Sequence, residues 1–183
     1  MAGLPHYDNS KASKNLYEPM HQNLFEVTFL VPGLAGSELL IEHVNTVSGL
    51  DGLNPAIDPV EQKYKFADRS YAGMPAQTFV DIPINFSLNL NDANQAYIYK
   101  TLQNWYKRIY NPLTGEMGLK KDYVGDIIIV EYNRTGDIYR KVTLRDCFPT
   151  GQPTGLDTRE YATPDPLTIE MTFRCDHWDE ELS

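Results

Sequence analysis

The chain has 183 residues, a length that suits one domain with a sizeable core. Its 25 acidic and 16 basic side chains give a formal net charge of −9. This excess of acidic residues argues against a protein that binds nucleic acid tightly, because binding to phosphates is driven by Lys and Arg side chains.

The first 22 residues are polar, contain Pro5 and Pro19, and show no hydrophobic period. They predict an extended N-terminal arm (residues 1–22), followed by a single domain over residues 23–183. The sequence has neither a basic start followed by an apolar run nor 18 consecutive apolar residues. We therefore expect neither a secretion signal nor a membrane span.

The domain begins with a strand in which Phe25, Val27, Phe29 and Val31 alternate with other residues, and Pro32-Gly33 ends it. A second strand is expected from about residue 39 to residue 48. Residues 49–76 are rich in Gly, Pro and Asp and predict a long loop with a short strand-like patch at 60–66. Long irregular segments of this kind are usually functional or disordered.

Residues 80–90 alternate without a fault and predict a strand. One face is apolar, and the other carries only short polar groups and Pro83, with no Lys or Arg. Such a face is unusual for a strand that simply meets solvent. Pro83 indicates an edge, a bulge, a rim position or a point where pairing shifts toward a neighbouring subunit, because proline has no N–H to donate to a ladder. The polar residues of this face are Asp81, Asn85, Ser87 and Asn89.

A helix is predicted over residues 92–110, capped by Asn91 or Asp92 and stopped by Asn111-Pro112. Its apolar residues follow spacings of four, three and four, which is one face of a helix. The predicted helix core consists of Ile98, Leu102, Trp105 and Ile109.

Two further strands, 126–133 and 137–147, are joined at Arg134-Thr135-Gly136 and predict a hairpin. A Gly- and Pro-rich loop over 148–166 leads to a last strand from Leu167 to Arg174. The fold class is therefore mainly β (α+β): an antiparallel β-barrel or sandwich flanked by one long α-helix, with an extended N-terminal arm.

Motifs of nucleotide and hydrolytic enzymes are missing: there is no Gly-x-Ser-x-Gly elbow, no phosphate-binding P-loop and no Gly-x-Gly-x-x-Gly turn. We expect no enzyme, no catalytic residue and no cofactor. The best metal candidate is Cys175-Asp-His177, with Cys147 as a further ligand. A zinc site needs more than one Cys-x-His, so a buried thiol beside a surface histidine is favoured. Two cysteines are also too few for a disulfide framework, and reduced thiols are expected.

Other polar and aromatic groups have ordinary interpretations that we favour. The histidines His6, His21 and His43 are scattered and predict surface or capping roles. The C-terminal carboxylates predict a solvated acidic terminus in preference to a cation site. These carboxylates are Asp176, Asp179, Glu180 and Glu181. The aromatic residues of the helix predict core and interface contacts in preference to stacking on nucleic-acid bases. They are Tyr97, Tyr99, Trp105, Tyr106 and Tyr110.

The order of these elements resembles a known family. The first part comprises Val47-Ser-Gly-Leu50, Tyr71-Ala-Gly-Met-Pro75, Asp81-Ile-Pro-Ile-Asn-Phe-Ser-Leu88 and Leu102-Gln-Asn-Trp105. The later part comprises Gly136-Asp137, Leu144-Arg-Asp-Cys-Phe-Pro149 and Leu167-Thr-Ile-Glu-Met-Thr-Phe173. Over about residues 23–178 the chain resembles the inner tail tube protein of contractile-tailed bacteriophages. Related tubes occur in type VI secretion and other contractile injection systems.

The resemblance implies a structural protein of the virion tail, assembled in the bacterial host cytoplasm. It implies hexameric rings stacked into a tube inside a contractile sheath, with the sheath, baseplate and tail terminator proteins as partners. DNA would pass through the lumen without specific binding. If inner strands of six subunits close into one barrel, Asp81, Asn85, Ser87 and Asn89 would line that lumen.

Alternative functions remain open. A tube-like hub or baseplate adaptor, or the tube of a type VI or contractile injection system, would use the same fold. A monomeric β-barrel enzyme or small-ligand binder belongs to another class, and would stay monomeric where a tube protein forms rings or polymers.

Overall fold

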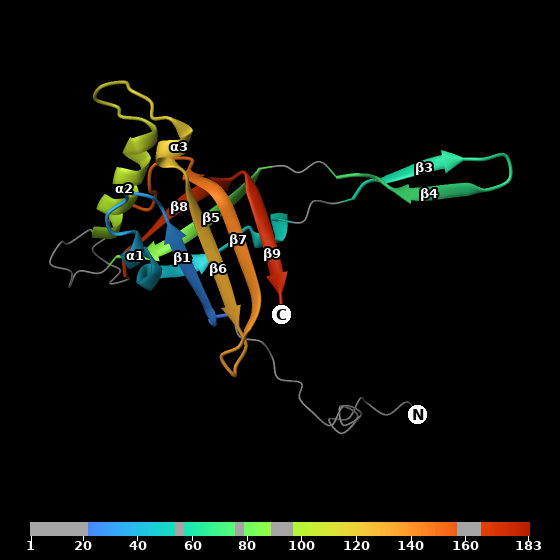
Figure 1. The fold of residues 1–183 in the computed structure, drawn as a ribbon, viewed down its shortest axis with the longest axis horizontal. Coiled ribbons are helices and arrows are strands. Elements are labelled where there is room, and N and C mark those ends of the chain that lie inside the picture. The colour runs from blue at the N-terminus through green and yellow to red at the C-terminus, as the bar shows by residue number, and fades with distance from the viewer. Residues whose placement is uncertain (1–21, 54–56, 76–78, 89–96, 157–165) are drawn as a thin grey trace, which may run out of the picture.

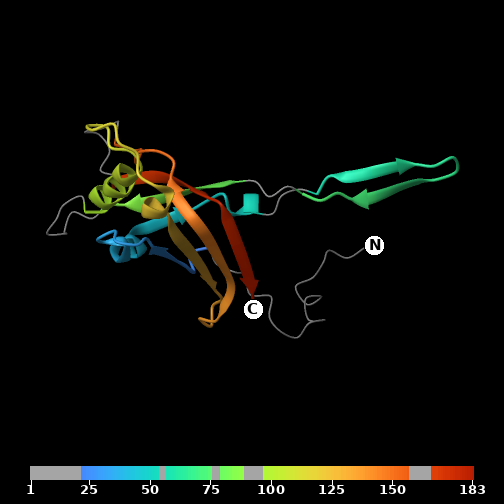
Figure 2. The same cartoon turned by 45° about the horizontal axis from the view of Figure 1, so that its top comes forward.

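The computed structural model describes residues 22–53, 57–75, 79–88, 97–156 and 166–183. The predicted arm, apart from Gln22, lies outside these ranges, as do Asn89 and the predicted helix caps. Within them, two antiparallel layers enclose a core, a main helix packs beside them, and a thin hairpin projects away (Figures 1 and 2).

Among the described residues, seven strands of the body form one antiparallel sheet, and six of them follow one continuous path. Hydrogen-bonded neighbours follow the order β1, β6, β7, β8, β5, β2, and β9 pairs with β7 beside this path. The bounds are β1 (Phe25–Leu30), β2 (Val44–Val47), β5 (Val80–Ser87), β6 (Gly125–Tyr132), β7 (Ile138–Pro149), β8 (Thr168–Cys175) and β9 (His177–Leu182). With one main helix beside these strands, the prediction of a mainly β fold is confirmed.

Strand β7 connects the two layers. Its first half pairs with β6 and β9, whereas its end pairs with β8 through Phe148 and Pro149. The change of partner follows Asp146, which has a φ of 54°, a conformation uncommon for a residue other than glycine. The Asp146 N–H donates a hydrogen bond to the Asp126 carboxylate (3.2 Å), which holds this bend.

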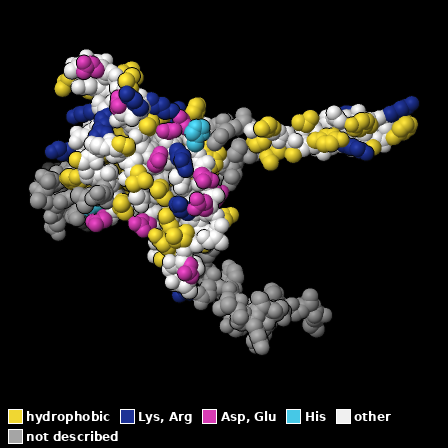
Figure 3. Space-filling model, viewed as in Figure 1, with side chains coloured by type: hydrophobic (Ala, Val, Ile, Leu, Met, Phe, Trp, Pro, Cys, Tyr) yellow, Lys and Arg dark blue, Asp and Glu magenta, His cyan; other side chains and the backbone are white. Residues whose placement is uncertain are grey.

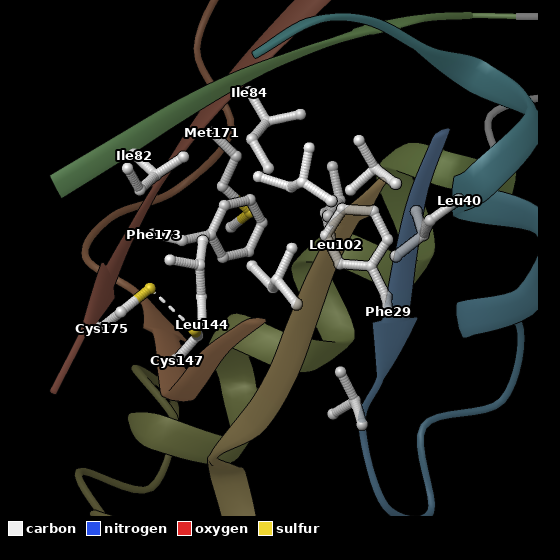
Figure 4. Packing of buried hydrophobic residues seen from close by; sticks show 14 of the residues in the cluster. Phe29, Leu40, Ile82, Ile84, Leu102, Leu144, Cys147, Met171, Phe173 and Cys175 are labelled. Atoms are coloured by element: carbon white, nitrogen blue, oxygen red, sulfur yellow. Dashed lines mark hydrogen bonds between the residues drawn. The ribbon is translucent and has the colours of Figure 1, made fainter. Parts of the chain in front are cut away.

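The core comes from the alternating residues of the strands. Ile82, Ile84 and Phe86 of β5 are fully buried, as are Ile169, Met171 and Phe173 on the neighbouring β8 (Figure 4). Burying one such side chain stabilises the fold by roughly 1.5–3 kcal/mol. The apolar face of the sheet is therefore the face that is directed toward the interior.

Helix α2 (Tyr97–Ile109) packs its apolar stripe on this core. Ile98, Leu102 and Trp105 are buried, while Ile109 at the last turn is half-buried. The Trp105 ring lies 5.1 Å from Phe173 and 6.5 Å from Phe29 between centroids. Its indole Nε1 donates to the Tyr123 carbonyl (2.7 Å), so the short helix α3 (Lys120–Tyr123) is tied to α2.

The predicted strand over residues 39–48 is wrong in its first half. Residues there form α1 (Ser37–Leu40) and a 3-10 helix, η2 (Ile41–His43), before β2 begins at Val44. Gly36, with a φ of 89°, allows the turn into α1, and Leu40 is fully buried. A run of apolar residues this short does not distinguish a helical turn from a strand, and contact with the core decides it.

The predicted loop over residues 49–76 contains regular structure. After a 3-10 helix, η3 (Leu50–Leu53), the strands β3 (Pro59–Lys63) and β4 (Asp68–Ala72) pair as an antiparallel hairpin. All ten residues of the two strands are exposed. The strand-like patch at 60–66 therefore marks only the first strand and the turn of this hairpin.

The acidic terminus includes a strand that the sequence analysis did not predict, because residues 177–182 form β9, most of whose residues are exposed. This strand lies against β7 with oppositely charged partners across the ladder: Glu180 pairs with Arg140 (2.6 Å) and Glu181 with Lys141 (3.3 Å). Asp176, just before β9, pairs with Lys120. Cross-strand charge pairs stabilise a strand that has little apolar alternation to reveal it in the sequence.

Candidate assembly surfaces

The outward face of β5 and β8 is polar along its whole length. The antiparallel register sets Asp81 opposite Arg174, Pro83 opposite Thr172, Asn85 opposite Glu170 and Ser87 opposite Thr168. These side chains alternate with the buried core residues, so they point away from the interior of the subunit.

At one end of this face, the Arg174 guanidinium forms a bidentate salt bridge with the Asp81 carboxylate. Its Nε and Nη2 donate to the two carboxylate oxygens at 2.8 and 2.7 Å. The hydrogen bonds from Arg174 hold the pKa of Asp81 below its ordinary value, while partial burial opposes the shift. Both side chains are nearly half exposed, at 47% and 44%, so water screens much of this attraction.

In the middle of the face, the Asn85 amide bridges three strands. Its Nδ2 donates to Thr46 of β2 (3.2 Å) and to the Glu170 carboxylate of β8 (3.3 Å). Ser87 donates from its hydroxyl to the His43 carbonyl (3.4 Å). Polar side chains of this face are thus hydrogen-bonded to each other and to the neighbouring backbone, which reduces their capacity to bind a ligand.

Two expectations for this face need correction. The face as a whole is not free of basic residues, because β8 brings Arg174 next to Asp81. Pro83 lies neither on an edge strand nor at a bulge of β5, which pairs with β8 on one side and β2 on the other. The Pro83 carbonyl accepts a hydrogen bond from the Ser48 N–H (3.1 Å), beyond the last residue of β2, so the ladder with β2 ends where proline has no donor.

The hairpin β3–β4 has two different faces. On one face Val60 pairs with Tyr71, and Arg69 lies over the ring of Tyr64, 5.9 Å from its centroid. On the other face Lys63 is paired with Asp68 in the ladder. The apolar side chains of the first face remain 45–54% exposed. An isolated two-stranded hairpin is at best marginally stable in water, so this one needs another surface to cover it.

A groove of about 750 Å³ lies between the two strands at the ends of the sheet path, β1 and β2. Its apolar lining comes from Leu24, Phe25, Val44, Val47, Leu50 and Ile129. Its polar lining comes from Gln22, Asn23, Asn45, Thr46, Glu131 and Tyr139. Glu131 accepts hydrogen bonds from Tyr139 and from Arg140 (3.1 Å), and the bond to Glu131 raises the pKa of Tyr139 to about 12.

The two cysteines meet in the core. Cys147 of β7 and Cys175 of β8 are fully buried and their Sγ atoms lie 2.6 Å apart (Figure 4). Contact with Cys175 and burial both raise the pKa of the Cys147 thiol, so it stays protonated at neutral pH. His177 is exposed at the start of β9, and no cluster of metal ligands occurs among the residues that the structure describes.

The remaining singled-out residues lie apart. His6 and His21 are outside the described residues, and His43 is half-buried in η2. On α2, Trp105 is in the core and Tyr99 and Tyr106 pack against it. Tyr110, directly after the helix, is 39% exposed. None of the helices in the described ranges is both long and apolar enough to cross a membrane.

The chain has the fold of tube-type proteins of contractile injection systems, over nearly its full length. It superposes on the tube-terminating cap of the anti-feeding prophage with a TM-score of 0.59, at 14% identity over 92% of this chain and 95% of that one. A chain of the extended sheath–tube complex of PVC, an extracellular contractile injection system, gives 0.58 and 16% identity over 96% and 97%. The sheath/tube terminator of the same system gives 0.57 and 16% over 91% and 99%.

These likenesses are in structure and not in sequence. No protein-family model matches the sequence, and neither does any curated protein. The resemblance to inner tube proteins is therefore confirmed at the level of the fold.

Proposed function

We propose that this chain is a structural, non-enzymatic subunit of the inner tube of a contractile tail, forming hexameric rings that stack. The observation that carries the proposal is the fold, which matches chains from tube, cap and terminator assemblies over more than nine-tenths of both partners. The exposed apolar face of the hairpin supports it, because a monomer leaves that face in water.

In the proposed ring, the outward face of β5 and β8 lines the channel. Asp81, Arg174 and Glu170 sum to one negative charge per subunit on this face, and the arginine is neutralised by its neighbour. A channel wall with a small negative charge, whose polar groups are already hydrogen-bonded to each other, should bind a DNA duplex weakly. Binding to phosphates is driven by counterion release, which requires Lys or Arg side chains that are not already paired with carboxylates. We propose a phage tail that conducts DNA as the biological setting, with Asn89 as a further lining residue.

A second candidate is a cap or terminator that forms one ring at a tube end. Two of the three structures compared above are described as a tube-terminating cap and a terminator, and this description favours the second candidate. Negative-stain microscopy of the purified protein separates the candidates. Stacked rings support the tube, single rings support the cap, and a monomer at all concentrations contradicts both.

The channel is tested by charge. Asn85→Lys with Thr172→Lys adds two positive charges per subunit to the proposed wall without touching Asp81 or Arg174. We expect assembly to survive and DNA release from particles to slow, most strongly at low salt. Glu116→Lys, in the exposed loop after α2, changes the charge equally and is the matched control. Equal release from both variants contradicts the channel assignment.

A further inference from the structure

We propose that the groove between β1 and β2 is the receptor for the hairpin tip of a second copy of this chain, with Phe66 as its anchor. This inference rests on the proposed function, since such a contact has a role only within an assembly. It assigns a partner surface to two exposed features of the described residues, the hairpin and the groove.

The tip is a tight turn of four residues, Tyr64–Ala67, closed by a hydrogen bond from the Tyr64 N–H to the Ala67 carbonyl (3.1 Å). Phe66 is 92% exposed at its end, and the Lys65 ammonium lies 5.5 Å from the centre of its ring. A rigid turn that presents an aromatic ring loses little conformational freedom on binding, which suits an anchor residue.

The tip is also basic. Residues 63–69 contain Lys63, Lys65 and Arg69 against Asp68, a net charge of +2 in a chain whose formal charge is −9. Figure 3 shows basic side chains toward the far end of the hairpin, with hydrophobic side chains along its length. The tip therefore favours an acidic surface with an apolar floor.

The groove offers both properties. Its floor is apolar, Glu131 is its acidic lining residue, and no Lys or Arg lines it in the described part of the chain. Glu131 shares the guanidinium of Arg140 with Glu180, at 3.1 and 2.6 Å, so this group of three side chains carries one excess negative charge. A lysine beside an inserted aromatic ring would meet this excess carboxylate.

The occupant must come from another copy. The hairpin points away from the body in both views of the molecule (Figures 1 and 2), so a subunit's own tip does not reach its own groove. A contact that joins two different surfaces of identical chains is head-to-tail and repeats from copy to copy. This is the type of contact that rings or stacks of one protein require.

Cross-linking between differently substituted copies tests the contact. One preparation carries Asn45→Cys in the groove and the other Ala67→Cys at the tip, and both positions are exposed. After co-assembly, a short bis-maleimide should join the two chains into a dimer on a denaturing gel. The native cysteines are buried and should not react, which each preparation alone will check.

The matched control is Ala72→Cys, at the base of the same hairpin opposite Pro59. It lies five residues from Ala67, roughly 17 Å along a strand, so it should give little dimer with Asn45→Cys. Assembly without the 67–45 dimer, or equal dimer yields from positions 67 and 72, overturns this inference and leaves the proposed function standing. Absence of any assembly overturns both.

A second experiment measures the anchor. Phe66→Ala should raise the protein concentration needed for assembly by about tenfold or more, as expected for a buried aromatic contact. Met74→Ala, 99% exposed at the hairpin base, is the control and should leave that concentration nearly unchanged. Equal effects of the two substitutions contradict a role for Phe66 as the anchor.

Discussion

The sandwich and the hairpin β3–β4 use the same alternation of side chains with opposite results. In β5, Ile82, Ile84 and Phe86 are fully buried against the rest of the chain. In the hairpin, Val60 and Tyr71 are paired across the ladder in the same way, yet they remain 54% and 45% exposed. Alternation therefore predicts a strand, but it does not reveal whether the core that the strand needs lies in the same molecule.

The largest effect should come from a charge in the body. Leu102→Asp places a carboxylate on the fully buried stripe of α2, where packing is worth about 2–5 kcal/mol. We expect insoluble protein. Asn104→Asp, exposed on the same helix, should stay soluble and melt near the parent temperature. A soluble Leu102→Asp protein with parental melting would contradict the buried assignment of this helix face.

A smaller loss is expected where the body leads to the hairpin. Gly49 has a φ of 84°, and an added Cβ would lie 2.8 Å from the Asp81 carbonyl oxygen. Gly49→Ala should lower the free energy of unfolding by about 2 kcal/mol or more. Gly136→Ala has a similar φ of 89° in open space, so it should cost only about 1 kcal/mol. The free energies of unfolding are measured with urea. If Gly49→Ala and Gly136→Ala lower them equally, the backbone near Gly49 moves to relieve the clash, which contradicts this prediction.

The half-exposed ion pair on the polar face should contribute less. Asp81→Asn should lower the free energy of unfolding by less than about 1 kcal/mol at neutral pH. Because Arg174 lowers the pKa of Asp81 in the folded state, this contribution is present above the ordinary pKa of 3.8 and is lost as the pH falls through the lowered value. A difference between the two proteins that grows on acidification would contradict this account.

The smallest effect on the subunit should come from removing the hairpin. The Gly73 N–H donates to the Asp58 carbonyl (3.0 Å), so the two ends meet, and residues 59–72 can be replaced by a two-residue Gly-Ser link. We expect the melting temperature of the monomer to change by no more than about 2 °C, because none of those residues is buried. Assembly should be lost. A variant that melts much lower would show that the hairpin belongs to the body's folding unit.

The sequence correctly predicts those strands and that helix of the body in which the apolar residues all lie on one face of the element. Strands β5, β6 and β8 and the helix stripe through Leu102 and Trp105 are of this kind, because their period alone reports burial. The hairpin and β9 are harder to predict. In β9, Glu180 and Glu181 pair with Arg140 and Lys141, which are 40 residues away in the sequence, and a local pattern carries no sign of such partners.

The candidate surfaces follow the same rule. The polar alternation of Asp81, Asn85 and Ser87 is visible in one strand, but Arg174 becomes their neighbour only through the pairing of β5 with β8. The groove requires β1, β2 and the end of β6 to be placed together, which is a property of topology. Tip residue Phe66 is apolar and next to lysines in the sequence, and its exposure is the one feature that only the structure supplies.

The bend at Asp146 makes β7 a member of both layers. Neither layer can lose this strand without exposing the core side of the other, so the two should open as one cooperative unit. Hydrogen exchange in β6 and β8 should then share one opening free energy, close to that of global unfolding. The hairpin, held by its own ladder alone, should exchange long before them. Local opening of the hairpin should therefore leave the fold of the body intact.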